Sequence, residues 1–184
     1  MGKLVRLRAV EIADWEFYYQ LNQMTTDLDR RDYEIVFPQS KEAIRAWAEE
    51  QSKAKGDRDE FRFQIEALSS GASVGSLNTH TADHRVGSFM YGLSIAPDHQ
   101  RKGYGSEAIR LVMRYFFQEK RYQKVSAEVY SFNEPSIRLH DHLGFTLEGR
   151  LRRMVYTGGQ FYDALIYGML REEFEQRWPN AGIE

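Results

Sequence analysis

The sequence predicts an α+β fold in which helices flank a mixed, mostly antiparallel sheet of about six to seven strands. Apolar and polar residues alternate in several short segments, as they do in half-buried strands. Turns containing glycine join some of these segments into hairpins, whose strands are antiparallel. Helical segments separate others, and a strand–helix–strand unit requires at least one parallel pairing. A mixed sheet covered by helices follows from this order.

The composition fits one globular domain. The chain has 184 residues, of which 42% are hydrophobic and 28% charged, values typical of globular proteins. A formal net charge of -2 lacks the basic excess of a general nucleic-acid binder. The absence of cysteine excludes disulfides, thiol nucleophiles and thiolate metal sites. With no signal peptide or membrane-spanning segment evident, we expect a cytoplasmic protein with a domain at residues 3–174 and a C-terminal tail at 175–184.

The first third of the chain predicts one strand and two helices. Residues 3–10 alternate as a short strand, and residues 11–24 place apolar side chains close to helical spacing, with Asp14 near the start. Pro38 breaks the polar segment that follows. Ser40 is a typical N-cap for a second helix, which ends at Gly56.

Three strands are predicted next. Residues 60–68 and 74–80 alternate on either side of the turn sequence SSGAS and predict a hairpin. Residues 86–97 predict a longer strand that Pro97 ends. Gly92 interrupts this strand, and an internal glycine indicates a bulge or a close approach of other atoms.

The second half predicts a helix, a strand, a helix and a final hairpin. Apolar residues between Ala108 and Phe117 form one helical stripe, and residues 124–130 alternate as a strand. Residues 133–144 predict a short helix with Asn133 as its cap and Gly144 at its end. Residues 145–174 predict two strands joined by the sequence TGG.

The segment QRKGYGS, residues 100–106, places two glycines at the start of the strongest predicted helix. The first N–H groups of a helix are unpaired and carry partial positive charge, so they attract anions. Gly103 and Gly105 lack a Cβ and leave these amides accessible, while Arg101 and Lys102 add positive charge. The spacing matches neither a nucleotide P-loop nor the dinucleotide-binding fingerprint. The loop therefore predicts a pyrophosphate site that needs no metal.

Two motifs in this order resemble the GCN-five-related N-acetyltransferase (GNAT) family. The acetyl-CoA signature Gln/Arg-x-x-Gly-x-Gly/Ala is present as QRKGYG at residues 100–105, after a strand and before a long helix. The segment NEPSIRLHDHLGF at residues 133–145 resembles the second motif of the family. The end of the chain looks like the branch that contains ribosomal-protein alanine and spermidine N-acetyltransferases. The resemblance covers residues 3–174 and implies a three-layer fold.

The resemblance also implies which residues bind acetyl-CoA as the acyl-donor cosubstrate. Backbone amides of the glycine loop would hold the pyrophosphate, the backbone of the preceding strand would pair with the pantetheine arm, and the second motif would contact the arm or the thioester end. The implied residues are Leu93, Ser94, Ile95, Gln100, Arg101, Lys102, Gly103, Tyr104, Gly105, Ser106, Asn133 and Ser136.

The chemistry requires a polarised thioester carbonyl, a neutral amine and a stabilised or protonated leaving thiolate. A backbone N–H near Leu93 or Ser94 can polarise the carbonyl. Relatives carry a tyrosine as general acid where this chain has His140, so His140 is either the acid or a polar helix residue near the sulfur. Met90 stands where some relatives have a glutamate base. Tyr91, His80, a water relay or direct binding of the neutral amine are the alternatives.

The resemblance implies that the acceptor site is walled by the first two helices, their connecting loop and the final hairpin. Those segments contain carboxylates and aromatic rings, which suit a cationic amine; the carboxylates are Asp27, Asp29, Asp32, Glu34 and Asp163. We therefore expect direct acetyl transfer to a primary amine, preferably a small polyamine-like molecule. A protein N-terminus is the second choice, and a non-catalytic CoA-binding sensor is the alternative of another class. Neither nucleic acid nor membrane is expected as a partner, and a homodimer is left open.

Overall fold

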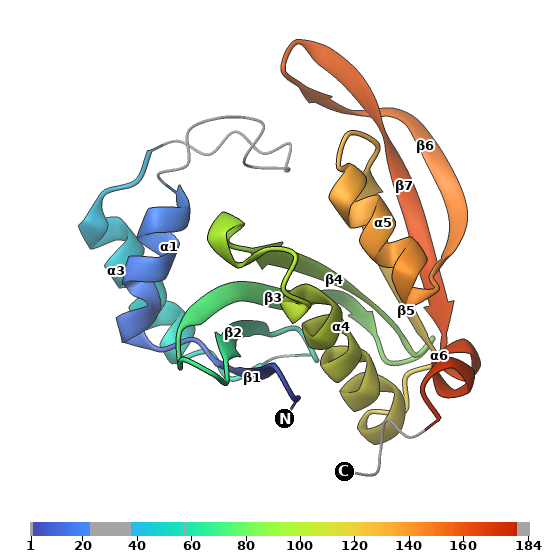
Figure 1. Cartoon of the computed structure of the whole chain (residues 1–184), viewed down its shortest axis with the longest axis horizontal. Coiled ribbons are helices and arrows are strands. Elements are labelled where there is room, and N and C mark those ends of the chain that lie inside the picture. The colour runs from blue at the N-terminus through green and yellow to red at the C-terminus, as the bar shows by residue number, and fades with distance from the viewer. Residues whose placement is uncertain (1, 23–37, 57, 180–184) are drawn as a thin grey trace.

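The computed structural model describes residues 2–22, 38–56 and 58–179, and Figure 1 shows the whole chain. Its seven strands form one sheet in the order β1-β2-β3-β4-β5-β7-β6. Only the pair β4–β5 is parallel, so the predicted mixed, mostly antiparallel sheet is confirmed. The strands are β1 (Val5–Ala9), β2 (Arg62–Ala67), β3 (Ser73–Asp83), β4 (Ser88–Ile95), β5 (Lys124–Tyr130), β6 (Thr146–Thr157) and β7 (Gln160–Leu170).

Helices lie on both faces of this sheet. A 3-10 turn (Ile12–Asp14) leads into α1 (Trp15–Asn22), which lies beside α3 (Lys41–Ser52) (Figure 1). The Ser40 hydroxyl accepts a hydrogen bond from the amide of Ala43 at 3.1 Å, so the predicted N-cap is confirmed. A short turn (Pro97–His99) precedes α4 (Tyr104–Arg114), which continues as a π-helical turn (Tyr115–Glu119). The other helices are α5 (Glu134–Leu143) and α6 (Arg171–Arg177).

The main core lies between α4 and the sheet. Apolar side chains of β2 to β5 and β7 pack there against one face of α4, and the phenyl rings of Phe89 and Phe116 stack with their centroids 4.0 Å apart. A smaller cluster, centred on Tyr18 and Ile44, lies under α1 and α3. The alternation of apolar and polar residues along the strands thus distinguishes the two faces of the sheet. The main core with α4 lies on one face, and the smaller cluster with α1 and α3 lies on the other.

Strands β4 and β5 diverge after a short parallel ladder. Their pairing covers only Ser88 to Met90 on β4 and Lys124 to Ser126 on β5. The ladder of β4 with β3 continues without a register shift past Gly92 to Ile95, so the predicted bulge at Gly92 is wrong. The alternative of a close approach is observed, because a Cβ on Gly92 would lie 2.8 Å from Oδ1 of Asn78. Strands β4 and β5 therefore separate where their parallel ladder ends, after Met90 and Ser126, and an opening lies between them.

Helix α6 closes the core at the end of β7 and was not anticipated from the sequence. Phe174 is buried at 1% exposure, and its ring lies 5.5 Å from that of Phe117 between centroids. Trp178, after the helix, packs against the same core. The segment REEFEQR begins directly after a strand and has a single apolar residue, Phe174. Its sequence therefore shows little helical periodicity. No helix in the described part of the chain is long and apolar enough to cross a membrane.

Candidate active site

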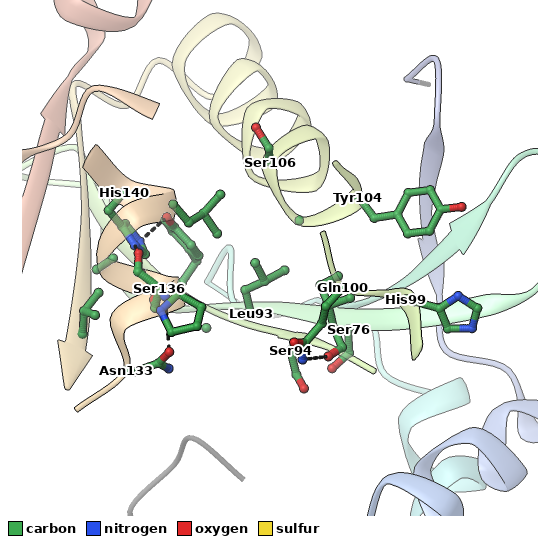
Figure 2. A pocket seen from close by; sticks show the side chains of 18 of the residues that line it. Ser76, Leu93, Ser94, His99, Gln100, Tyr104, Ser106, Asn133, Ser136 and His140 are labelled. Atoms are coloured by element: carbon green, nitrogen blue, oxygen red, sulfur yellow. Dashed lines mark hydrogen bonds between the residues drawn. The ribbon is translucent and has the colours of Figure 1, made fainter. Parts of the chain in front are cut away.

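A cavity of about 660 Å³ occupies the opening between β4 and β5. Its lining comes from both faces of the sheet and from the start of α4 and the side of α5. Figure 2 shows Asn133, Ser136 and His140 on one side, Gln100 and Tyr104 on the other, with Leu93 and Ser94 between them. The structure thus brings the two sequence motifs, which begin at Gln100 and Asn133, to the same cavity.

Almost all the predicted site residues line this cavity. They are Tyr91, Leu93, Ser94, Ile95, Gln100, Arg101, Gly103, Tyr104, Gly105, Ser106, Asn133, Ser136 and His140. Lys102 is the exception and is exposed outside the lining. The side chain of Asn133 accepts a hydrogen bond from the amide of Ser136 at 3.2 Å, so Asn133 is a helix cap that also lines the cavity.

The glycine loop positions the start of α4. Gly103 is the N-cap residue in the left-handed conformation, with φ +82, which a side chain would disfavour. A Cβ on Gly105 would lie 3.1 Å from Cδ2 of Leu93, so helix and strand meet closely there. The Glu107 carboxylate accepts hydrogen bonds from the backbone amides of Lys3, Leu4 and Val5 at 2.7 to 2.9 Å. This contact ties the start of β1 to the first turn of α4.

Strand β4 presents backbone groups to the cavity. The amide of Ala96 donates to Val74 on β3, and alternate residues of a strand direct their backbone groups to opposite sides. Ser94 therefore directs its amide toward β3, while Leu93 and Ile95 direct theirs toward the opening. The carbonyl of Ile95 accepts from Nε2 of Gln100 at 3.0 Å. No strand in the described part of the chain pairs with this side of β4 at Leu93 and Ile95. The N–H and C=O of Leu93 and the N–H of Ile95 are therefore a strand edge that suits a ligand carrying amides.

Tyr91 and His140 form a buried pair on the cavity wall. They are 5% and 4% exposed, and the tyrosine hydroxyl lies 2.9 Å from Nε2 of His140. Nδ1 of His140 lies 2.7 Å from the carbonyl oxygen of Ser136. Because a carbonyl only accepts, Nδ1 carries the proton, and the Tyr91 hydroxyl donates to Nε2. Burial lowers the pKa of His140 below 6.5 and raises that of Tyr91 well above 10, so both groups are neutral near pH 7.

The opposite side of the cavity carries a carboxylate that the sequence analysis missed. Glu128 on β5 lines the cavity, is exposed, and forms no ion pair with any residue that the structure describes. It lies near His80 on β3. Desolvation lowers the pKa of His80 below 6.5, although the negative charges of Glu60 and Glu128 act to raise it. The alternation along β5 predicts that Glu128 points to the sheet face opposite to that of Val125, Ala127 and Val129. Only the tertiary structure shows that Glu128 borders the opening between β4 and β5.

The expected acceptor residues have separate outcomes. Asp27, Asp29, Asp32 and Glu34 lie outside the described residues. Asp163 accepts from the guanidinium of Arg150 at 2.5 Å and from the backbone amide of Arg153. These contacts lower the pKa of Asp163, with the Arg153 amide as the largest cause. The Asp163 carboxylate is therefore already hydrogen-bonded within the hairpin. Met90 pairs with His80 across β3 and β4, on the sheet face that carries Glu128.

Comparisons with known proteins agree with this architecture. The family model for the acetyltransferase (GNAT) domain matches residues 5–146. The SPbeta prophage-derived uncharacterized N-acetyltransferase YokL of Bacillus subtilis is 41% identical, with 95% of this chain and 94% of the relative covered. The spermidine N(1)-acetyltransferase of Escherichia coli is 28% identical over 97% of this chain and 94% of its own.

Solved structures show the same fold. The crystal structure of a GNAT-family acetyltransferase from Bacillus anthracis superposes with a TM-score of 0.78 at 24% identity, covering 94% of this chain and 98% of that one. The chain belongs to the GNAT family of acetyltransferases. It is an N-acetyltransferase, and acetyl-CoA is the acyl donor that the family uses.

Proposed function

We propose that the protein transfers an acetyl group directly from acetyl-CoA to a small, cationic, polyamine-like primary amine. The observation that carries this proposal is the cavity between β4 and β5, which joins the glycine loop and the free edge of β4 to the carboxylate of Glu128. One opening in the sheet thus offers a place for an anionic donor and a cationic acceptor. The acceptor class is also supported by the 28% identical relative named for spermidine.

The donor would bind by backbone contacts. The N-terminus of α4 holds the pyrophosphate, because its amides are unpaired and Gly103 and Gly105 leave them accessible. The pantetheine arm adds to the free edge of β4 as a short strand, pairing its amides with Leu93 and Ile95. The N–H of Leu93 is then available to polarise the thioester carbonyl. Gln100 fixes the end of β4 through the Ile95 carbonyl.

Tyr91 and His140 would stabilise the leaving thiolate. Both line the cavity beside Ser136, but neutral His140 carries its proton on Nδ1, bonded to the Ser136 carbonyl. The Tyr91 hydroxyl has a single hydrogen, which it donates to Nε2 of His140 in this structure. Its raised pKa keeps that hydrogen in place near pH 7, so the hydroxyl can turn from Nε2 to the sulfur as negative charge develops there. We assign the donor role to Tyr91 and its orientation to His140. No covalent intermediate is required, and the chain contains no cysteine to form one.

Glu128 would attract the acceptor. A carboxylate at the mouth of the cavity favours an ammonium group over a neutral one, and a polyamine keeps a second cation while its reacting amine is neutral. A protein N-terminus offers only one amine before its neutral backbone. The second amine of a polyamine is therefore the feature that Glu128 selects. A CoA-binding sensor remains the contrasting function, in which CoA binds without turnover.

The test is release of CoA thiol from acetyl-CoA with polyamines, monoamines and N-terminal peptides as acceptors. Polyamines are expected to give the highest kcat/KM. The substitution Glu128→Gln should raise the KM for polyamines about fivefold, as expected for a partly screened ion pair, and leave that for acetyl-CoA unchanged. Glu119→Gln, which removes an exposed carboxylate outside the cavity, should change neither.

Two outcomes would contradict this proposal. Preference for peptides, unaffected by Glu128→Gln, would make the protein an N-terminal acetyltransferase. Tight binding of acetyl-CoA without turnover of any acceptor would favour the sensor.

A further inference from the structure

One row of residues crosses four strands on the sheet face that carries α1 and α3. Arg62 on β2 pairs with Asn78 on β3, and Asn78 pairs with Gly92 on β4. Glu128 on β5 lies at the same level, because it and Gly92 are each two residues beyond the last pairing of β4 with β5. A sequence neighbour of each one belongs to the main core or packs against it, so these four residues lie on the opposite face. All four line the cavity.

The side chain of Asn78 reaches over Gly92. A Cβ on Gly92 would lie 2.8 Å from Oδ1 of Asn78 and 3.8 Å from its Nδ2, so the oxygen is the nearer end of the carboxamide. A side chain in place of Gly92 would displace that oxygen. Asn78 is half-buried, and its carboxamide has no hydrogen-bond partner among the residues that the structure describes. Its oxygen can therefore accept a hydrogen bond from a ligand in the cavity.

Two consecutive residues of β4 face the two sides of the sheet. Tyr91 belongs to the main core, and Gly92 therefore faces the opposite side. The proposed donor to the leaving sulfur thus lies on one face of the sheet, and Asn78 lies on the other. An acyl group in the opening between β4 and β5 would be attacked from the side of Asn78 and would release its sulfur toward Tyr91.

The charges along the row fit an incoming amine. Glu128, across Gly92 from Asn78, carries the carboxylate that we propose attracts the acceptor. Arg62, on the other side of Asn78, repels a cation. His80, two residues from Asn78 on the same face of β3, is neutral near pH 7 because desolvation lowers its pKa below 6.5. The amine is thus drawn to the Glu128 side of Asn78, above Gly92.

We propose that Asn78 positions the attacking amine: its Oδ1 accepts one N–H of the amine and directs the nitrogen lone pair at the thioester carbonyl. This inference rests on the proposed transfer of acetyl to an amine. The lone pair forms the new N–C bond, the C–S electron pair leaves with the sulfur, and the surplus proton on nitrogen passes to solvent through the opening. Nitrogen gains positive charge in the transition state, so its hydrogen bond to Oδ1 becomes charge-assisted and strengthens. An interaction that strengthens in the transition state raises kcat.

The test measures acetyl transfer to the amine that the wild-type protein prefers. Asn78→Ala should lower kcat about 100-fold, the loss that a misplaced reacting group causes, and leave the KM for acetyl-CoA unchanged. Asn78→Asp keeps an oxygen acceptor and should recover most of this loss. Its profile of kcat should also move to higher pH, because the new carboxylate stabilises the ammonium form of the amine. Gln64→Leu is the matched control, since it removes a buried carboxamide from the same sheet face, outside the cavity, and should keep kcat.

A double-mutant cycle tests the contact between Gly92 and Asn78. Gly92→Ala should lower kcat, because its Cβ displaces Oδ1 of Asn78. In the Asn78→Ala background the same change should cost much less, since no carboxamide remains to be displaced. Fully additive losses would contradict the role of Asn78, because Gly92→Ala would then act on the substrate alone.

Wild-type kcat in folded Asn78→Ala would overturn the inference, as would equal losses of kcat in Asn78→Ala and Gln64→Leu. Thermal denaturation shows whether each variant is folded. If the wild-type protein transfers acetyl to no amine, the proposed function itself fails. A preference for peptides would overturn only the proposed acceptor class, because an N-terminal amine needs the same orientation.

Discussion

At the scale of single residues, the hydrogen bond from Tyr91 to His140 is the basis for proposing Tyr91 as the group that assists the leaving thiolate. His140 occupies the sequence position of the family's acid, but its Nε2 accepts rather than donates. Its pKa is lowered from 6.5 mainly by burial, so the neutral form prevails above that pH. As the pH falls through the lowered pKa, protonation would turn Nε2 into a donor and break the present arrangement. Stability from the neutral form is therefore complete above 6.5 and decreases below it.

Tyr91→Phe should lower kcat about 100-fold, the loss expected when a donor to developing negative charge is removed. The KM for acetyl-CoA should change little, because the backbone of β4 is unaltered. Steady-state kinetics checks this, together with a pH profile in which His140 leaves no titration above pH 6.5. Tyr167→Phe is the matched control, since it removes a hydroxyl that donates to Asp141 near His140 but outside the cavity. Equal losses in the two variants would contradict a specific role for Tyr91.

At the scale of elements, the glycine loop fixes how α4 meets β1 and β4. Gly103 has φ +82, and a Cβ there would lie 3.1 Å from Cδ1 of Leu4. Leu4 is itself held by the hydrogen bond that its backbone amide donates to the Glu107 carboxylate on α4. The conformation of the loop is therefore supported by the neighbouring strand, which the motif alone does not reveal.

Gly103→Ala should weaken CoA binding about tenfold, because the amides at the start of α4 shift away from the pyrophosphate. Its free energy of unfolding should fall by about 1–2 kcal/mol, the usual penalty of a side chain in the left-handed region. Gly71→Ala is the control for this penalty. Gly71 has φ +69 in the β2–β3 turn with nothing within 4 Å, so the stability loss should be similar while CoA affinity is kept. Calorimetry and urea denaturation measure the two quantities. Unchanged CoA affinity in Gly103→Ala would argue against the loop as the pyrophosphate site.

At the scale of the whole molecule, the core extends beyond residue 174. Phe174 and Trp178 close the end of the sheet from α6 and contact one another, with centroids 5.2 Å apart. The predicted boundary between domain and tail falls inside this helix. We propose that the folded domain includes all of α6, because Trp178, which follows the helix, also packs against the core.

Phe174→Ala is expected to reduce the free energy of unfolding by about 3–5 kcal/mol, as for other large-to-small changes of a buried aromatic residue. Tyr115→Ala serves as the control, since Tyr115 is 48% exposed and should lose far less. Chemical denaturation followed by fluorescence gives both values. If Phe174→Ala loses no more than Tyr115→Ala, α6 does not fold as part of the same cooperative unit.

The sequence by itself determined the order of elements up to β7, the mixed sheet, the glycine loop and the second motif, because each depends on local periodicity, turn residues or short spacings. Ser40, Asn133 and Gly144 take the capping positions that their chemistry predicts. The tertiary structure decided where β4 and β5 separate, that Glu128 faces the opening, that Tyr91 donates to His140, and that Asn78 reaches over Gly92. These relations join residues far apart in the chain, and only packing sets the distances and protonation states between them.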